Sequence, residues 1–181
     1  MIGVLCLQGD FAAHAAALSA QGIEHKLVRL PTDLKDCSGL IIPGGESSAL
    51  LKLMQPWDFL TAIRKFYEAG GSIYGTCAGM ILLAKNVRPA QDSLGLIDID
   101  VERNAYGRQI DSKTIYSSKY DKRIFTAEVP ITLIRAPRIT RTGTAVKTLV
   151  WDGATPMLVQ QGRILAASFH PEISDTSLAS S

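Results

Sequence analysis

The stretch Gly75-Thr76-Cys77-Ala78-Gly79 decides how this sequence can fold and where its chemistry can lie. It follows a short apolar run, Ser72-Ile73-Tyr74, and leads into Met80-Ile81-Leu82-Leu83-Ala84, which is typical of the start of a helix. A glycine two residues on either side of a nucleophile, between a strand and a helix, is the pattern of a nucleophile elbow, here with cysteine in place of serine. Side chains at the two glycines would collide with neighbouring backbone in so sharp a turn. We therefore expect Cys77 over the end of a sheet, at the N-terminus of a helix.

Two interpretations of Cys77 remain open from this stretch alone. At a helix N-terminus, the helix dipole and the free N–H groups stabilise a thiolate and can bind an oxyanion. A small buried cysteine beside two packing glycines would give the same five letters, since short motifs often match by chance.

The length and composition of the chain fit one soluble globular domain, residues 1–181. The formal net charge of +2 predicts no strong attraction to nucleic acid or membranes, and no apolar run is long enough to span a bilayer. The three cysteines, Cys6, Cys37 and Cys77, are odd in number and widely spaced, which argues for a reducing compartment and against a disulfide framework. Because the sequence has neither a basic leader nor a Cys-x-x-Cys spacing, we expect a cytoplasmic protein without a bound metal.

Short apolar runs alternate with helical patterns through the first half of the chain. Strands are expected at residues 2–7, 23–28, 40–42 and 72–74, the second of them nearer an edge because it is partly polar. Helices are expected from an N-cap at Asp10 to about residue 20, over 47–54 with Ser47-Ser48 as the cap, and over 58–69. This alternation specifies a parallel sheet with helices on both faces, and active sites in such sheets form at the carboxyl ends of the strands. Three loops should therefore converge at one edge: Gln8-Gly9, Gly44-Gly45-Glu46-Ser47 and the stretch around Cys77.

The second half of the chain is less helical. Strands are expected over residues 95–101, 114–116, 127–135 and 146–151, separated by polar turns. Residues 157–160 and 164–169 are expected to form a hairpin about Gln161-Gly162. These patterns predict an antiparallel extension of the sheet before the chain returns to the core.

Gly44-Gly45 follows an expected strand and has two interpretations. The two residues can form a plain turn. Alternatively, backbone without side chains lets N–H groups approach a ligand closely. A phosphate loop is not favoured, because no Gly-Lys-Ser or Gly-Lys-Thr follows.

His170-Pro171-Glu172 is the second informative stretch. Pro171 biases the residue before it to an extended backbone, and residues two apart in an extended segment point to the same side. A carboxylate at Glu172 would then fix the tautomer of His170 and raise its basicity, unless the pair is a solvated surface turn. The other histidines, His14 and His25, have no such neighbour in the sequence and are interpreted as structural or surface residues.

Arginines gather in two further segments. The segment Arg135-Ala136-Pro137-Arg138-Ile139-Thr140-Arg141 is more typical of a solvated loop than of a site, and Glu102-Arg103-Asn104 with Gly107-Arg108-Gln109 is similarly ambiguous. The most economical interpretation is that one or two of these arginines bind a carboxylate bidentately while the others lie at the surface.

Together these pieces point to covalent catalysis more strongly than any one of them alone. A cysteine elbow, a later His-x-Glu and an exposed Gly-Gly loop supply a nucleophile, a base, a group that orients the base and oxyanion donors.

Five motifs of the sequence resemble those of one family, the glutaminase subunits of pyridoxal 5'-phosphate synthase. They are Pro43-Gly44-Gly45-Glu46-Ser47, Gly75-Thr76-Cys77-Ala78-Gly79, Glu102-Arg103-Asn104, Ile134-Arg135-Ala136-Pro137 and Ser168-Phe169-His170-Pro171-Glu172. The cysteine elbow and His-Pro-Glu alone mark only a class I glutamine amidotransferase, and the other motifs narrow the resemblance to these subunits. The resemblance covers residues 2–172, and the opening Leu7-Gln8-Gly9 agrees with it.

The resemblance implies an α/β fold of three layers, α/β/α, with a mostly parallel central sheet of the flavodoxin-like, class I glutamine amidotransferase type. It implies a catalytic triad of Cys77, His170 and Glu172, with no cofactor. L-glutamine would be held by residues of three loops: Gly45, Glu46, Ser47, Arg103, Ile134 and Arg135.

The resemblance also implies a partner, and the chain departs from the family's pattern at one place, its C-terminal residues. Ammonia would pass to a synthase subunit of (βα)8 fold, with twelve copies of each subunit in the complex, and binding of that subunit would activate the glutaminase. Members of the family usually continue past His-Pro-Glu into a final amphipathic helix. The nine residues from Ile173 onward are polar and poor helix formers, so either the sequence is truncated or part of one face of the sheet is left bare.

The expected mechanism is hydrolysis of the glutamine side-chain amide through a thioester on Cys77. The N–H of Ala78 and one N–H of Gly44-Gly45 would hold the oxyanion. Because glycine has little steric restriction, the Gly44-Gly45 peptide can turn either its C=O or its N–H toward the site. Two alternatives stay open: another class I amidotransferase or thiol hydrolase with the same elbow, and a non-catalytic binding module of the same fold.

Overall fold

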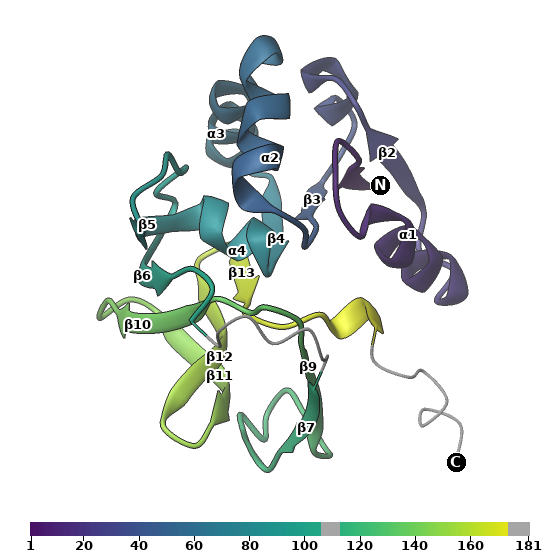
Figure 1. Cartoon of the computed structure of the whole chain (residues 1–181). Coiled ribbons are helices and arrows are strands. Elements are labelled where there is room, and N and C mark those ends of the chain that lie inside the picture. The colour runs from purple at the N-terminus through teal and green to yellow at the C-terminus, as the bar shows by residue number, and fades with distance from the viewer. Residues whose placement is uncertain (106–112, 174–181) are drawn as a thin grey trace.

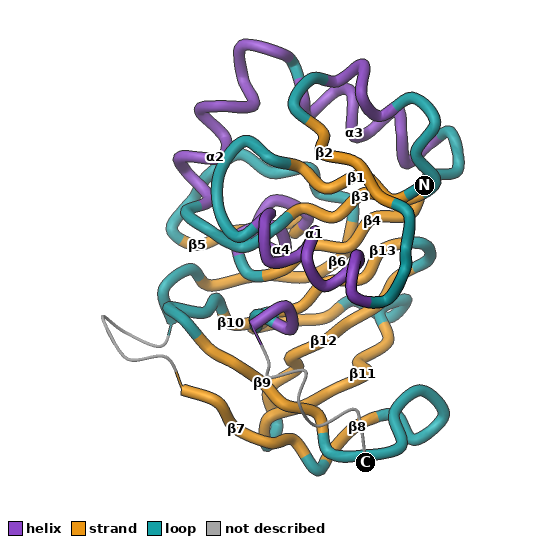
Figure 2. The backbone as a smooth tube through the Cα atoms, turned by 90° about the vertical axis from the view of Figure 1, so that its right-hand side faces the viewer, coloured by secondary structure: helices purple, strands orange, loops and turns teal. Residues whose placement is uncertain are grey.

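An eight-stranded sheet forms the centre of the structure, a computed structural model that describes residues 1–105 and 113–173. In spatial order its strands are β2 (His25–Val28), β1 (Ile2–Leu5), β3 (Gly39–Ile42), β4 (Ser72–Thr76), β13 (Ile164–Ala167), β12 (Thr155–Gln161), β11 (Lys147–Asp152) and β8 (Lys119–Tyr120), as Figure 2 shows. The five strands from β2 to β13 are parallel, and the remaining three run antiparallel to their neighbours. The expected mostly parallel sheet, with β2 at its edge and an antiparallel extension, is confirmed.

Helices cover the parallel strands on both faces (Figure 1). They are α1 (Phe11–Ala20) on one face and α2 (Ser47–Met54), α3 (Phe59–Glu68) and α4 (Ala78–Leu83) on the other. Successive residues of β3 point to opposite faces, so Leu40 and Ile42 pack in the same core cluster as Leu50 of α2. Ile41 is not part of that cluster and lines a cavity to which Leu18 of α1 also contributes. These contacts confirm the three-layer α/β/α architecture.

Two smaller sheets extend the second half. One has the order β10 (Arg138–Thr142), β6 (Ile97–Glu102) and β5 (Ala84–Arg88), and the other pairs β7 (Lys113–Ser117) with β9 (Val129–Leu133). The expected hairpin is confirmed as β12 and β13, which turn at Gly162. Because β13 then runs parallel to β4, with Ala167 opposite Thr76, the chain after β13 emerges beside the end of β4. This register brings His170 to the same edge of the sheet as Cys77.

Both expected helix caps are wrong in detail. Asp10 precedes α1, but its side chain makes no capping hydrogen bond. Glu46, rather than Ser47 or Ser48, caps α2, because its carboxylate accepts hydrogen bonds from the N–H groups of Ser48 (3.1 Å) and Ala49 (2.6 Å). A two-oxygen carboxylate satisfies two of the four free N–H groups of a helix start, which a hydroxyl cannot do.

The arginine-rich segment expected as a solvated loop contains a strand. Arg138 in β10 pairs with Glu102 (2.9 Å), and Arg141 pairs with Asp98 (2.7 Å) and Asp100 (2.9 Å) of the adjacent β6. The acidic residues that hold these cations lie some forty positions upstream, so the arginine run gives no sign of the pairing. The strand expected over residues 127–135 is shorter in the structure, where it is β9. Strand β5 was not expected.

Several expectations fall outside the described residues. They concern Gly107-Arg108-Gln109 and the chain from residue 174 to 181. Short 3-10 turns complete the described chain: η1 (Pro31–Leu34), η2 (Gln55–Trp57) and η3 (Pro171–Ile173). Over the same residues, no helix combines the length and the apolar character needed to cross a membrane.

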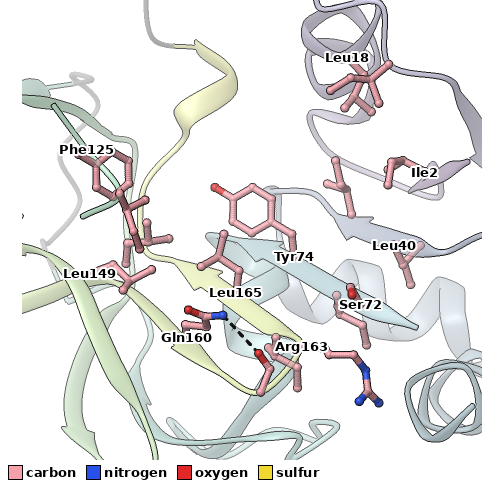
Figure 3. Close-up of a pocket in the computed structure, with 18 residues that line it drawn as sticks. Ile2, Leu18, Leu40, Ser72, Tyr74, Phe125, Leu149, Gln160, Arg163 and Leu165 are labelled. Carbon is pink, nitrogen blue, oxygen red and sulfur yellow. Dashed lines mark hydrogen bonds between the residues drawn. The ribbon is translucent and has the colours of Figure 1, made fainter. Parts of the chain in front are cut away.

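The face of the sheet that carries α1 is not fully covered by the described residues. A cavity of about 640 Å³ lies there, and Figure 3 shows Tyr74, Leu165 and Phe125 among its walls. Leu18 of α1 borders one side of it and Leu149 of β11 the other. The walls are mainly apolar, so this face differs from the opposite one, where three helices close the core.

Replacement of Leu50 by alanine should lower the free energy of unfolding by about 2–5 kcal/mol, because Leu50 is fully buried between α2 and the sheet and its loss leaves a cavity. Leu53 lies on the same helix but is 44% exposed, so Leu53→Ala should change the free energy by no more than about 0.5 kcal/mol. Urea unfolding followed by circular dichroism measures both. Equal losses in the two variants would contradict the packing described for α2.

Candidate active site

Cys77 occupies a strained turn between β4 and α4. Its φ of 48° and ψ of −102° are rarely adopted by a residue with a side chain. Its N–H donates to the carbonyl of Ala167 at 2.8 Å, which ties the turn to β13. A side chain at Gly75 would lie 2.7 Å from the backbone of Gly79, and one at Gly79 would overlap the carbonyl oxygen of Ile42. The two glycines are therefore required by close backbone approach, as the elbow pattern predicts.

His170 is buried beside this turn and is held by a carboxylate. Its Nδ1–H donates to Oε1 of Glu172 at 2.9 Å, and Oδ2 of Asp10 lies 3.5 Å from the same nitrogen. The expected pairing of His170 with Glu172 is present, but its expected geometry is wrong. Pro171 begins the 3-10 turn η3 instead of an extended segment, which proline tolerates because the first residue of a helical turn needs no N–H partner.

The environment of His170 favours its protonated form. Burial alone would lower the pKa of this imidazole, but the hydrogen bond to Cys77, the hydrogen bond to Glu172 and the negative charge of both groups raise its pKa to about 10. A protonated His170 at neutral pH favours a resting pair of thiolate and imidazolium. Glu172 is almost completely buried, with 1% of its side chain exposed, so little water competes for this interaction.

The loop after β3 lies against the imidazole of His170. A side chain at Gly44 would overlap the ring of His170, so only glycine fits there. The carbonyl of Gly44 accepts a hydrogen bond from the N–H of Asp10 at 3.1 Å. Gly45 has a φ of 149°, and a side chain there would lie 2.5 Å from Oε1 of Gln8. Two consecutive glycines, Gly44 and Gly45, therefore face the site. Of the two interpretations of this loop, a plain turn does not account for these close contacts.

A cavity of about 340 Å³ joins these loops. Cys77 and His170 line it, together with the six residues that the family resemblance assigned to glutamine: Gly45, Glu46, Ser47, Arg103, Ile134 and Arg135. The three remaining predicted site residues, Gly44, Ala78 and Glu172, adjoin its walls without being part of the lining. The three loops expected at one edge of the sheet do meet there.

An ion pair fixes one wall of the cavity. Arg103 Nη2 donates to Oγ of Ser48 at 2.8 Å and lies 3.3 Å from Oε1 of Glu46. Burial opposes the charge of Glu46, but hydrogen bonds from the Ser48 and Ala49 amides and the charge of Arg103 hold its pKa below the usual range. Ser47 Oγ donates to Oε1 of Gln91 at 3.0 Å. The wall thus presents one anion and one cation in fixed positions.

The sequence analysis gave no site role to Asp10 or His14, and it named Gln8 only as part of a loop expected at this edge. Asp10 was expected as a cap, yet its carboxylate turns toward His170. His14 was interpreted as a structural or surface residue; it is buried, and its Nε2 lies 3.4 Å from Oε2 of Glu172. Gln8 accepts the N–H of Glu46 through its side chain at 3.1 Å. All three follow β1, and only the position of that loop at the common sheet edge could have drawn attention to them.

The donor atoms of Asp10, His170 and Glu172 lie within 4.8 Å of one another, a grouping that could hold a metal ion. Nδ1 of His170 is one of these atoms and already donates its hydrogen to Glu172. A metal at that nitrogen would displace this hydrogen and break the contact that orients the ring. The donor set therefore suits a histidine–carboxylate pair better than a metal site.

Known proteins resemble the chain over nearly its whole length. Residues 4–179 match the SNO glutamine amidotransferase family. The pyridoxal 5'-phosphate synthase subunit PdxT of Deinococcus radiodurans is 45% identical over 180 residues, covering 96% of this chain and 90% of its own. PdxT of Koribacter versatilis is 48% identical over 173 residues, covering 95% and 88%. A crystal structure of a glutamine amidotransferase superimposes with a TM-score of 0.87 at 42% identity, covering 96% of this chain and 91% of its own. The structure of PurLQS from Thermotoga maritima, at 18% identity, a TM-score of 0.70 and coverage of 94% and 87%, shares the fold.

Loss of the Cys77 side chain should move the titration of His170 to lower pH, because the thiolate charge and the hydrogen bond from the ring are both lost. In the parent protein the imidazolium should persist to about pH 10. Imidazole ¹⁵N chemical shifts recorded against pH in the parent and in Cys77→Ala measure the change. Cys37→Ala is the matched control, since this thiol faces the carbonyl of Asp33 instead. A His170 titration that is identical in parent and Cys77→Ala would refute the thiolate–imidazolium pair.

Proposed function

The chain belongs to the SNO glutamine amidotransferase family, and on this premise we propose that it hydrolyses the side-chain amide of L-glutamine to L-glutamate and ammonia as the glutaminase subunit of pyridoxal 5'-phosphate synthase. One observation carries the proposal. The strained Cys77 and the buried His170 line the same cavity as six residues of the glutamine-binding motifs, and Glu172 holds the imidazole from behind. We further propose that residues 1–181 act as one glutamine amidotransferase domain.

In the first half of the reaction, the thiolate of Cys77 attacks the carboxamide carbon of glutamine and forms a tetrahedral intermediate. The N–H of Ala78, the first of α4, and an N–H of the Gly44-Gly45 loop receive the negative charge on oxygen. His170 gives its proton to the leaving nitrogen, the C–N bond breaks, and ammonia and a thioester result.

In the second half, water attacks the thioester carbon while His170 takes one of its protons. The C–S bond breaks, which releases glutamate and restores the thiolate of Cys77. Glu172 keeps the ring of His170 in the orientation that both proton transfers need.

The cavity also suits the α-amino acid end of glutamine. A free amino acid carries an ammonium group and a carboxylate, so its site needs an anion and a cation at fixed positions. Glu46 would receive the ammonium group, while Arg103 and Arg135 would receive the carboxylate, with Ser47 and Ile134 completing the wall. These residues come from three separate loops, so glutamine would bind only in the folded protein.

Ammonia made here would serve a synthase subunit, as the pairing of subunits in the relatives' names implies. We propose that this partner has a (βα)8 fold, that the complex holds twelve copies of each subunit, and that it works in the cytoplasm. No cofactor takes part in the amide hydrolysis as derived, and pyridoxal phosphate would form on the partner. A simple thiol esterase would have an activity that does not depend on glutamine, and a non-catalytic module would have no activity that requires the Cys77 thiol. Glutamine-dependent release of ammonia therefore distinguishes the proposal from both of these alternatives.

Cys77→Ala should abolish glutaminase activity, measured as ammonia release in the presence of the synthase subunit, because no other thiol lines the cavity among the described residues. Binding of the partner should be retained. Cys37→Ala, with a thiol on the far side of β1, should keep the parent rate. Turnover of Cys77→Ala close to the parent would remove Cys77 from the mechanism.

The synthase subunit should raise glutamine turnover at least tenfold, equivalent to about 1.4 kcal/mol of the barrier. In the structure the Gly44 carbonyl is held by the N–H of Asp10, and rotation of the Gly44-Gly45 peptide would exchange this bond for an N–H aimed at the oxyanion. Gly45→Ala restricts that rotation and should lower the activation ratio more than it raises KM.

The matched control is Gly22→Ala, which also has a positive φ but lies in a remote turn with open space around it. Its activation ratio should equal that of the parent. Gly44→Ala is unsuitable, because its side chain would displace His170 itself. Full activity of the isolated chain at saturating glutamine would rule out this switch and leave the triad untouched.

A further inference from the structure

Helix α1 buries a histidine where an amphipathic helix would bury apolar residues. Of its ten residues, His14 is the one that is buried, and the others are half-buried or exposed. Most of them are alanines, so α1 brings little apolar area to the sheet. A buried imidazole at the centre of such a helix needs polar partners, because an unsatisfied polar group in the interior is costly.

Those partners are the residue before the nucleophile and the third member of the triad. Nε2 of His14 lies 3.1 Å from Oγ1 of Thr76 and 3.4 Å from Oε2 of Glu172. Oε2 is buried and accepts no hydrogen bond of ordinary geometry from the described residues, while Oε1 of the same carboxylate receives the hydrogen from His170. His14 therefore faces the oxygen of Glu172 that the triad leaves open.

The tautomer of His14 follows from these distances. If Nε2 carried a lone pair, that lone pair would face a carboxylate oxygen at 3.4 Å, and the buried charge would lack a donor. If Nε2 carries the hydrogen, it can be shared between the carboxylate and the hydroxyl of Thr76. The second arrangement gives both acceptors a donor nearby, and we take it as the state of the folded protein.

The charged groups around His14 are consistent with a neutral ring. Burial lowers the pKa of His14. The charges of its neighbours act on this pKa in opposite directions, since Glu172 and Asp10 raise it and His170 lowers it. Tyr74 of β4 faces the same carboxylate, and its pKa is raised by burial and by the charge of Glu172, so it stays neutral as well. At neutral pH the single negative charge of Glu172 is thus shared between one imidazolium and one neutral N–H donor.

We propose that His14 is a positioning residue of the active site, whose Nε2–H holds the second oxygen of Glu172 and so fixes the carboxylate that orients His170. The inference rests on the proposed glutaminase function for its kinetic consequences. Both oxygens of Glu172 are then tied, one to each imidazole, and the plane of the carboxylate cannot rotate. Through Thr76, the same N–H also contacts the residue that precedes the nucleophile Cys77.

Two substitutions distinguish the effect of losing the Nε2–H donor of His14 from the effect of losing the volume of its side chain. His14→Leu keeps similar volume without a donor, and His14→Gln keeps an N–H near the position of Nε2. With the synthase subunit present, His14→Leu should lower kcat for glutamine at least tenfold while KM changes less than twofold, and the acidic limb of its pH profile should move to higher pH. His14→Gln should recover most of the lost kcat. Ala16→Gln, on the exposed side of the same helix, should match the parent.

A second readout does not need glutamine. The rate of alkylation of Cys77 by iodoacetamide, followed against pH by mass spectrometry of the Cys77 peptide, reports the thiolate–imidazolium pair directly. In His14→Leu the onset of alkylation should move to higher pH, and in His14→Gln it should return toward the parent. A parent that alkylates normally but releases no ammonia would count against the proposed function alone and leave this test of His14 intact.

Two results would overturn the positioning role. One is a His14→Leu variant with the kcat and alkylation profile of the parent. The other is an equal loss of kcat in His14→Leu and His14→Gln with both pH profiles unmoved, which would show that His14 serves only to fill space under α1.

Discussion

The backbone turn at Cys77 is the constraint on which the rest of the site depends. A positive φ at a residue with a side chain is unfavourable by about 1–3 kcal/mol and persists only where the surroundings enforce it. Here β13 enforces it on one side through the N–H of Cys77, and the carbonyl of Ile42 in β3 presses against Gly79 on the other. The two strands next to β4 thus determine where the sulfur of Cys77 lies.

His170 is brought to the same edge by a different path of the chain through the sheet. The chain makes an antiparallel excursion through β11 and β12 and comes back as β13, parallel to β4. That return places His170 next to Cys77, while the glycines at 44 and 45 let the loop after β3 come close enough to touch the imidazole. The site therefore depends on strand order: Cys77 follows β4, His170 and Glu172 follow β13, and Gly44 and Gly45 follow β3.

Sequence patterns predicted what depends on local periodicity and on compact motifs. The elbow, the βαβα half and the set of Cys77, His170 and Glu172 could be named because each is encoded within a few residues. The paired arginines of β10, the carboxylate cap at Glu46 and the contact of His14 with Glu172 could not, because their partners lie elsewhere in the chain or compete with an equally good local candidate. The His-Pro-Glu stretch shows the limit most clearly, since His170 and Glu172 pair through a 3-10 turn that begins at Pro171, where an extended segment was expected.

Helix α1 has a consequence for the cooperativity of the fold. Local opening of an element usually costs free energy in proportion to the apolar surface it exposes, and α1 rests beside a cavity and buries no apolar side chain completely. What its opening would break is the polar contact of His14 with Thr76 and Glu172. The amide protons of α1 should therefore exchange with solvent as a unit separate from the sheet, and their protection should report the order of the Glu172 carboxylate rather than the integrity of the core.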